Sequence, residues 1–459
     1  MMKVTIHRGT QEIGGTCVEL RHVDAHMVLD LGMPLVKRSD PGAGSFDADA
    51  VRKMTDDELR ASKLLPDIPG LYRWDTVSSP VAGLVISHAH LDHYGMAGRL
   101  REDVPVFCSG QTAAILEVSR VFLRGAPSFN DLRTKPFWRT FEAGPFTVKL
   151  HLADHSSPGS AAVEVRAGGR CLLYSGDFRA HGWVPTIYER FLEHAPRDVD
   201  LLLLEGTALG DPDRPFESES EIADRFRRLV EDKEGLGVVW ASGQNLDRLR
   251  AIREGVDMAR LKVPGARFVI DPYTAWVLYM ANEALEAEGH PRYHPDARSD
   301  DCIRVLPIDR YRDKLRRHGH GAFVDSLEGK LIDMEALVHG GRELLVLARW
   351  EVEQLLLERD PTDLPAPPSF VWSLWDSYLK KRHYRDKMPT ILHLEERHGV
   401  SHQSIHTSGH AAPKDLRRLV ETIHPRRITP IHTFEPDELA VLLSDAPVEG
   451  ARDGEVIEL

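Results

Sequence analysis

The chain has few cysteines, no long apolar run and no excess of basic residues. Its 459 residues include only four cysteines, Cys17, Cys108, Cys171 and Cys302, which are widely scattered and form no CxxC pair. This argues against a disulfide framework and a thiolate zinc site, and it favours a reducing, cytoplasmic setting. No apolar run approaches the roughly 20 residues that cross a bilayer, so we expect no membrane partner. The N-terminus, MMKVTIHRGT, has no apolar stretch behind a basic start, so we expect no secretory signal.

The charge balance is acidic. The formal net charge of −13 is not typical of a nucleic-acid-binding protein. Net charge hides local patches, however, and bound divalent cations make a site locally positive. The composition therefore leaves a nucleic-acid partner open.

The length and the apolar pattern indicate two kinds of structure in one chain. A chain of this size needs two domains, or one domain with a large insertion. The first two hundred residues read mostly as short strands, because apolar runs such as VAGLVISH and VDLLLLEG are broken by Gly, Asp or Ser. After Glu205, helices and strands alternate, beginning with a capping box from Ser218 to Glu221, and this alternation predicts a parallel sheet covered by helices.

The stretch HAHLDH holds the densest group of potential metal ligands. His88 and His90 are two residues apart, so in an extended segment both side chains point the same way, while Asp92 and His93 follow as the chain turns. Four potential ligands within six residues favour a metal site over a structural role, and one segment could supply two adjacent metals.

Further potential ligands lie at the ends of later strands. They are His155 in ADHSSPGS, Asp177 in LLYSGDF and His432 in ITPIHT. Together with HAHLDH they complete two sites of imidazole and carboxylate groups without cysteine. This set of ligands suits Zn²⁺ or Mn²⁺ rather than Ca²⁺ or an iron–sulfur cluster.

These motifs resemble those of the metallo-β-lactamase fold, and the full set resembles its β-CASP nuclease branch, which includes the RNase J and pre-mRNA cleavage-factor groups. GTQEIGGTCVEL resembles the glycine-rich start of that branch, and HSSPGS its third motif. Asp30 in LDLG matches the first motif, Glu205 in LLLEGT motif A, His410 in HTSGHA motif B and His432 in PIHT motif C. Motif A is Glu where RNase J usually has Asp. The middle of the insertion matches only in short pieces such as ASGQNLDRL.

The resemblance implies an α/β protein, a four-layer αββα metallo-β-lactamase sandwich with an inserted parallel-sheet α/β domain, the β-CASP domain. On that pattern, residues 1–208 form the first part of the metallo-β-lactamase domain. Residues 209–388 form the insertion, and residues 389–459 form the return segment of the metallo-β-lactamase domain.

The resemblance also implies a role for each matching residue. One metal is held by His88, His90 and His155, a second by Asp92, His93 and His432, and Asp177 bridges the two. Asp30 steadies the histidine-bearing loop through hydrogen bonds. Two divalent ions, Zn²⁺ first and Mn²⁺ as the alternative, activate a water as the nucleophile. His410, paired with Glu205, protonates the leaving oxygen.

Two further segments contain potential phosphate ligands. HTSGH places His406, Ser408 and His410 at alternate positions, so an extended segment presents all three on one side. Ser242, Asn245 and Arg248 in ASGQNLDR follow an expected strand, where a turn before a helix offers donors to another phosphate. Helix capping explains Ser242 and Asn245 equally well, and His406 could be an ordinary surface residue.

The leading hypothesis is a metal-dependent ribonuclease that cleaves single-stranded RNA as a 5′ exonuclease, an endonuclease or both. His432 at motif C favours RNA, because DNA-directed members of the branch tend to have valine there, and a DNA-directed nuclease is the alternative. A small-molecule or thioester hydrolase accounts for the metal ligands but not for Glu205, His410 or the insertion. A non-catalytic RNA-binding scaffold conflicts with the complete set of ligands. A homodimer is compatible with the resemblance.

Overall fold

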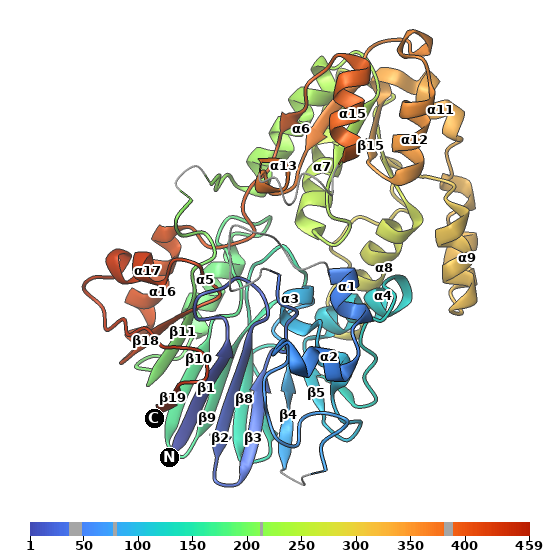
Figure 1. The fold of residues 1–459 in the computed structure, drawn as a ribbon. Helices are drawn as coiled ribbons and strands as arrows, with labels where there is room; N and C mark the ends of the chain where they lie inside the picture. The colour runs from blue at the N-terminus through green and yellow to red at the C-terminus, as the bar shows by residue number, and fades with distance from the viewer. Residues whose placement is uncertain (36–47, 77–79, 212–213, 381–388) are drawn as a thin grey trace. The chain divides into compact units, whose positions relative to one another are not determined.

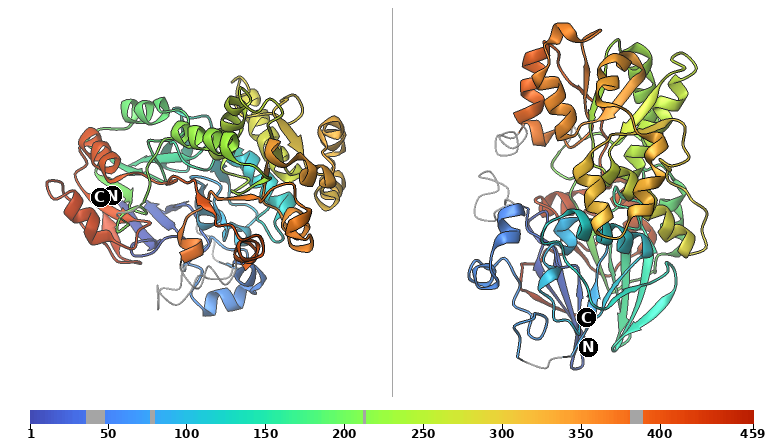
Figure 2. Two further views of the ribbon diagram at one scale, coloured as in Figure 1. Left: turned by 90° about the horizontal axis from the view of Figure 1, so that it is seen from above. Right: turned by 90° about the vertical axis from the view of Figure 1, so that its right-hand side faces the viewer.

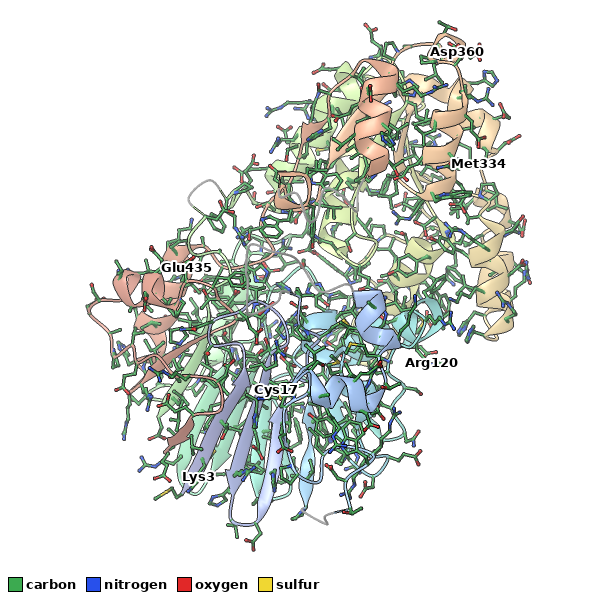
Figure 3. All side chains as sticks on the ribbon, in the orientation of Figure 1. Lys3, Cys17, Arg120, Met334, Asp360 and Glu435 are labelled. Atoms are coloured by element: carbon green, nitrogen blue, oxygen red, sulfur yellow. The ribbon has the colours of Figure 1, made fainter. Side chains whose placement is uncertain are left out.

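The computed structural model describes residues 1–35, 48–76, 80–211, 214–380 and 389–459. Within it the chain forms two compact units, Met1–Arg214 with Ser408–Leu459, and Pro215–Thr407. Figure 1 labels their helices and strands. Among the described residues, no helix combines the length and apolar composition that crossing a membrane requires. All four cysteines are buried and free, and Figure 3 labels Cys17 at the start of β2.

Two sheets make up the first unit. The first has the order β19-β1-β2-β3-β4-β5-β6 and the second β18-β11-β10-β9-β8-β7. The strands of the first are β1 (Met2–Arg8), β2 (Cys17–His22), β3 (Ala25–Leu29), β4 (Val81–Val85), β5 (Val106–Cys108), β6 (Leu132–Thr134) and β19 (Val456–Glu458). Those of the second are β7 (Thr140–Ala143), β8 (Phe146–Leu152), β9 (Ala161–Ala167), β10 (Arg170–Tyr174), β11 (Leu201–Glu205) and β18 (Ile428–Ile431).

The core of this unit lies between the two sheets. Alternate residues of β1, Val4 and Ile6 among them, pack with Val148 and Leu150 of β8, because successive side chains of a strand point to opposite faces. Strand β11 is apolar on both faces. Leu201 and Leu203 join the core between the sheets, whereas Leu202 and Leu204 pack with helices on the outer face.

Helices cover both outer faces. The outer face of the second sheet packs against α5 (Thr186–His194), α16 (Pro413–Ile423) and α17 (Pro436–Leu442). Helices α1 (Ala48–Lys53), α2 (Asp56–Ala61), α3 (Leu91–Tyr94) and α4 (Gly110–Phe122), with the short η1 (Ala97–Arg99), lie beside the first sheet in Figures 1 and 2. The result is the expected four-layer αββα sandwich.

The second unit is a six-stranded sheet of order β14-β13-β15-β12-β16-β17, and all its strand pairs are parallel. Its strands are β12 (Gly237–Trp240), β13 (Arg267–Ile270), β14 (Ile303–Val305), β15 (Leu344–Leu347), β16 (Ser369–Trp372) and β17 (Gln403–Ser404). The helices are α6 (Glu219–Asp232), α7 (Leu246–Ala259), α8 (Pro272–Ala287), α9 (Asp309–Arg317), α10 (Gly321–Ser326), α11 (Met334–Gly340), α12 (Trp350–Glu358), α13 (Ser377–Lys380) and α15 (Pro389–His398), with η2 (Glu328–Lys330), η3 (Gly341–Glu343) and η4 (Pro361–Asp363). The inserted α/β domain is thus confirmed, and α6 begins with the expected capping box of Ser218 and Glu221.

The structure ends the second unit later than the sequence analysis did. Gln403 and Ser404 of β17 pair with Val371 and Trp372 of β16, so the chain still belongs to the parallel sheet well after residue 388. A strand of two residues is too short to show an alternation of apolar and polar residues, so the sequence pattern did not predict it.

Candidate metal centre

All seven candidate metal ligands lie in the first unit, beyond the ends of its strands. The segment after β4 carries His88 and His90, and His90 is the N-terminal cap residue of α3, which presents Asp92 and His93. The other three follow β8, β10 and β18, and they are His155, Asp177 and His432.

His88, His90 and His155 form the first group. His90 Nδ1 lies 3.1 Å from His88 Nε2 and 3.2 Å from His155 Nε2. Burial lowers the pKa of all three imidazoles, to about 4 for His90, and the neighbouring histidines lower the pKa of His88 and His155 further. Three neutral imidazoles whose ring nitrogens converge in this way could hold a metal ion.

Asp92, His93 and His432 form the second group. Asp92 Oδ2 lies 3.3 Å from His432 Nε2 and 3.9 Å from His93 Nε2. Burial alone would raise the pKa of Asp92, but the imidazoles of His93 and His432 hold it well below its usual range. An ionised carboxylate with two imidazoles is a second set of potential ligands.

Asp177 lies between the two groups. Its Oδ2 atom is 3.2 Å from His93 Nε2, 3.8 Å from His88 Nε2 and 4.0 Å from His155 Nε2. Two buried atoms in this position, His93 Nε2 and Asp177 Oδ1, have no hydrogen-bond partner among the described residues. Buried polar atoms rarely remain unsatisfied, and coordination of divalent ions would satisfy both of these.

The second ring nitrogen of four of the histidines is already engaged. The contacts are His88 Nδ1 with Ser87 Oγ at 3.1 Å, His93 Nδ1 with Asp30 Oδ2 at 2.8 Å, His155 Nδ1 with Gly409 O at 2.6 Å and His432 Nδ1 with Thr207 Oγ1 at 2.8 Å. Such partners fix the orientation of a metal-binding imidazole. In each case the Nε2 atom is left to face the cluster.

Asp30 lies beneath the histidine-bearing loop and is hydrogen-bonded to it. Its carboxylate accepts hydrogen bonds from Ser87 N and Oγ, both at 2.7 Å, from His93 Nδ1 at 2.8 Å and from Tyr174 Oη at 2.8 Å. A Cβ atom at Gly32 would lie 1.6 Å from the carbonyl oxygen of Asp92. The glycine of LDLG therefore lets this segment approach the metal-binding loop.

Glu205 and His410 form a hydrogen-bonded pair beside the cluster. His410 Nδ1 donates to Glu205 Oε2 at 3.0 Å and lies 3.8 Å from Asp177 Oδ2. Glu205 is itself fixed, because its oxygens accept the backbone N–H groups of Phe178 at 3.0 Å and Thr207 at 3.4 Å. The carboxylate thus sets the direction of the His410 ring.

Four of the expected phosphate contacts lie in the second unit, and one of them requires a correction. The Arg248 guanidinium is fully buried and donates to both oxygens of Glu219, at 3.0 and 3.1 Å, and to Ser373 Oγ at 2.6 Å. It is a structural ion-pair partner and is not available to a phosphate. His406 Nδ1 lies 3.4 Å from Arg248 Nη1.

Local hydrogen bonds also engage Asn245, Ser242 and Ser408. Asn245 accepts from the backbone N–H of Arg248 and caps α7, and Ser242 Oγ accepts from Gln244 N at 3.2 Å. In the first unit, Ser408 Oγ accepts from His410 N at 3.1 Å, and the chain bends at residues 409–410. HTSGH is therefore not the fully extended segment that alternate spacing requires.

The hydroxyl groups that support the candidate ligands were not among the residues predicted from the sequence. Ser87 and Thr207 lie within two residues of His88 and Glu205 along the chain, and this proximity was a usable signal. Tyr174 gave no local signal, because its hydroxyl reaches Asp30 from the interior end of an apolar strand.

Comparisons with known proteins agree with this picture. Residues 49–225 match a family model described as a beta-lactamase superfamily domain. The chain is similar to Ribonuclease J of Mycolicibacterium smegmatis, with 26% identity over 259 residues that cover 55% of this chain and 42% of that protein. Ribonuclease J of Mycoplasma pneumoniae is 21% identical over 445 residues, 94% of this chain and 67% of the relative. The chain thus spans less than half the length of the first of these relatives.

A solved structure shares the fold. The crystal structure of a protein of unknown function from Enterococcus faecalis V583 superimposes with a TM-score of 0.74, covers 100% of both chains and is 20% identical in sequence.

Proposed function

Because the chain contains a metallo-β-lactamase superfamily domain and is similar to proteins named Ribonuclease J, we propose that it is a metal-dependent ribonuclease acting on single-stranded RNA. The observation that carries the proposal is the convergence of seven potential metal ligands beside the Glu205–His410 pair. All of these residues come from one chain, so the proposed site does not need a second copy.

The potential ligands fit two divalent ions. His88, His90 and His155 would hold one ion, Asp92, His93 and His432 the other, with Asp177 between them. We propose Zn²⁺ as the native ion, with Mn²⁺ as the alternative, because imidazole and carboxylate groups without thiolates suit both. When bound, two such ions stabilise the charge of the attacked phosphodiester and make hydroxide available near neutral pH.

His410 is the proposed general acid. Glu205 accepts the Nδ1 proton of His410, so the Nε2 atom is the one that can deliver a proton to the leaving ribose oxygen. The carboxylate also stabilises the imidazolium that must be present before the proton is transferred. Without this proton the leaving group would depart as an alkoxide, which is a poor leaving group.

The choice of RNA rests on two observations. The relatives reported above are named as ribonucleases, and the residue at motif C is His432, where DNA-directed members of the branch that the chain resembles tend to have valine. Ser408 and His406 remain proposed phosphate contacts, together with Ser242 and Asn245, whereas Arg248 is withdrawn.

The test compares substrates directly. Purified protein with Zn²⁺ or Mn²⁺ is incubated with 5′-monophosphate RNA, 5′-triphosphate RNA and DNA of the same sequence, and the products are sized. Mononucleotides indicate 5′ exonuclease action and internal fragments indicate endonuclease action. Preferred cleavage of DNA would establish the DNA-directed alternative. Absence of cleavage of any substrate by metal-loaded protein would contradict a nuclease and favour a binding scaffold.

A further inference from the structure

We propose that His181 is a positioning residue for His410, and that the carboxylate of Asp154 holds His181 in place. The inference rests on the proposed function, because it concerns the geometry of the proposed proton donor. Neither His181 nor Asp154 belongs to any of the groups of potential metal ligands among the described residues.

The loop after β10 is folded around Asp154, the residue before His155. The backbone N–H of Arg179 donates to Asp154 O at 2.7 Å, and its Nε atom lies 3.3 Å from Asp154 Oδ1. Gly182 N donates to Asp154 Oδ2 at 2.8 Å. Both charged side chains are buried, so this ion pair joins the loop that carries Asp177 to the loop that carries His155.

At Gly182 the backbone of this loop lies very close to the carboxylate of Asp154. A Cβ atom at this position would lie 2.3 Å from each carboxylate oxygen of Asp154. With any other residue here, either the loop or the Asp154 carboxylate would have to move. The glycine therefore allows the backbone next to His181 to lie against Asp154.

His181 reaches the return segment of the first unit. Its Nε2 atom donates to the carbonyl oxygen of Ser408 at 2.8 Å. The next carbonyl, that of Gly409, accepts from His155 Nδ1 at 2.6 Å. Two imidazoles, from the two loops that Asp154 joins, thus hold two successive peptide groups.

His410 follows these two peptide groups directly. The hydrogen bond to Glu205 sets the direction of its ring, but the position of the ring also depends on where the backbone places its Cα atom. A displacement of about 1 Å in a reacting group can cost about a hundredfold in rate. Unlike His155, His181 can be removed without removing a candidate metal ligand.

Hydrogen–deuterium exchange tests the anchor without any substrate. The variants are His181→Ala, His181→Gln, which keeps an N–H donor, and the control His22→Ala. His22 Nδ1 also contacts a backbone carbonyl, that of Met1 at 3.0 Å, outside the site. We expect faster exchange in the peptide that contains residues 408–410 for His181→Ala, recovery in His181→Gln and no change in the control. Unchanged exchange in His181→Ala would overturn the proposal.

Two phosphodiesters with different leaving groups test the consequence. RNA needs a proton on its leaving oxygen, whereas bis(p-nitrophenyl) phosphate releases a stable phenolate and does not. For His181→Ala we expect kcat on RNA to fall about 10- to 100-fold. We also expect an unchanged KM, a rate on the nitrophenyl ester close to wild type, and a full metal content. Equal losses on both substrates would overturn the positioning role.

The double variant His181→Ala/His410→Ala tests whether His181 acts through His410. If His181 acts through His410, the double variant is no slower on RNA than His410→Ala alone, because residues that act as a unit are not additive. A further loss in the double variant would overturn the proposal. If wild-type protein cleaves no RNA, the proposed function fails, while the exchange experiment still decides whether His181 anchors residues 408–410.

Discussion

Asparagine at position 30 would keep the shape of the Asp30 side chain but remove its charge. Asp30 has a φ of 55°, in the left-handed region that aspartate and asparagine both tolerate better than most residues. The substitution Asp30→Asn therefore changes the hydrogen-bond acceptor without adding backbone strain. Alanine at this position would remove the hydrogen-bond acceptor and add backbone strain at the same time.

The magnitude follows from the four hydrogen bonds that the carboxylate accepts, from Ser87 N, Ser87 Oγ, His93 Nδ1 and Tyr174 Oη. The amide nitrogen of asparagine cannot accept, so at least one of these buried donors loses its acceptor. Hydrogen bonds to charged groups contribute about 1.5–3 kcal/mol, and an unsatisfied buried group costs about 1–3 kcal/mol. We expect the free energy of unfolding to fall by roughly 2–5 kcal/mol.

Metal binding should weaken as well, because Asp30 fixes the ring of His93, a candidate ligand. Loss of such a supporting partner lowers metal affinity about 10- to 100-fold, equivalent to about 1.4–2.7 kcal/mol. Competition with a chromophoric chelator measures the affinity, and urea unfolding in the presence of a strong chelator measures the stability of the metal-free protein.

A matched control is available in the same unit. Asp200 accepts from Cys171 N at 2.9 Å and from Arg170 at 2.8 Å, and it contacts no candidate ligand. Asp200→Asn should change stability but not metal affinity. If Asp30→Asn binds metal as tightly as wild type, the support assigned to this carboxylate is refuted.

Three further perturbations test other parts of the structure. Asp92→Ala should abolish RNA cleavage without changing the circular-dichroism spectrum, because Asp92 is a candidate ligand rather than a core residue. Arg248→Ala should lower the free energy of unfolding in urea by about 3–5 kcal/mol, since it removes the ion-pair partner of the buried Glu219 carboxylate. Glu164→Gln should reduce the loss of stability in acid. Burial raises the pKa of Glu164, but the hydrogen bond from His151 helps to lower it to about 2. The stabilisation is complete above the unfolded pKa of about 4.3 and is lost as the pH falls toward about 2, which urea unfolding across this range measures.

Each of these three predictions would be contradicted by a specific result. Wild-type cleavage by Asp92→Ala would remove this residue from the site. A stable Arg248→Ala protein that binds RNA weakly would restore Arg248 as a phosphate contact. Acid-stability curves of the same shape for wild type and Glu164→Gln would show that this carboxylate does not contribute to the pH dependence.

The sequence predicted the fold where the apolar pattern is long and regular. The βα alternation after Glu205 and the capping box at Ser218 and Glu221 both correspond to the structure. Helix α4 was missed among the strands of the first unit, although Ser109 is a favourable N-terminal cap that accepts from Thr112 N. Its neighbours β5 and β6 are only three residues long, so local alternation could not separate strand from helix there.

The candidate site could also be predicted only in part, because its residues come from distant parts of the sequence. HAHLDH was recognisable because its potential ligands are adjacent in sequence. Asp177 and His432 come together because β10, β11 and β18 are neighbours in one sheet, and they meet HAHLDH because that sheet packs against the sheet that contains β4. Strand order is not encoded in any short stretch, so the resemblance to a family had to supply it. Arg248 shows the opposite error. A motif in a βα turn cannot reveal that its arginine turns inward to Glu219, which lies 29 residues earlier.

The acidic character of the chain bears on how the proposed site would take a phosphodiester. Asp92, Asp177 and Glu205 lie close together among imidazoles, and the whole chain has a net charge of −13. Burial lowers the pKa of His88 and His155, whereas at His93 and His432 the neighbouring carboxylates outweigh burial and raise the pKa. A chain with this acidic balance offers little general attraction to an anionic substrate. Two divalent cations held by the candidate ligands would add four positive charges and make the local field attractive to a phosphodiester. We therefore expect the ions that would serve the proposed chemistry to be needed for RNA binding at the site as well.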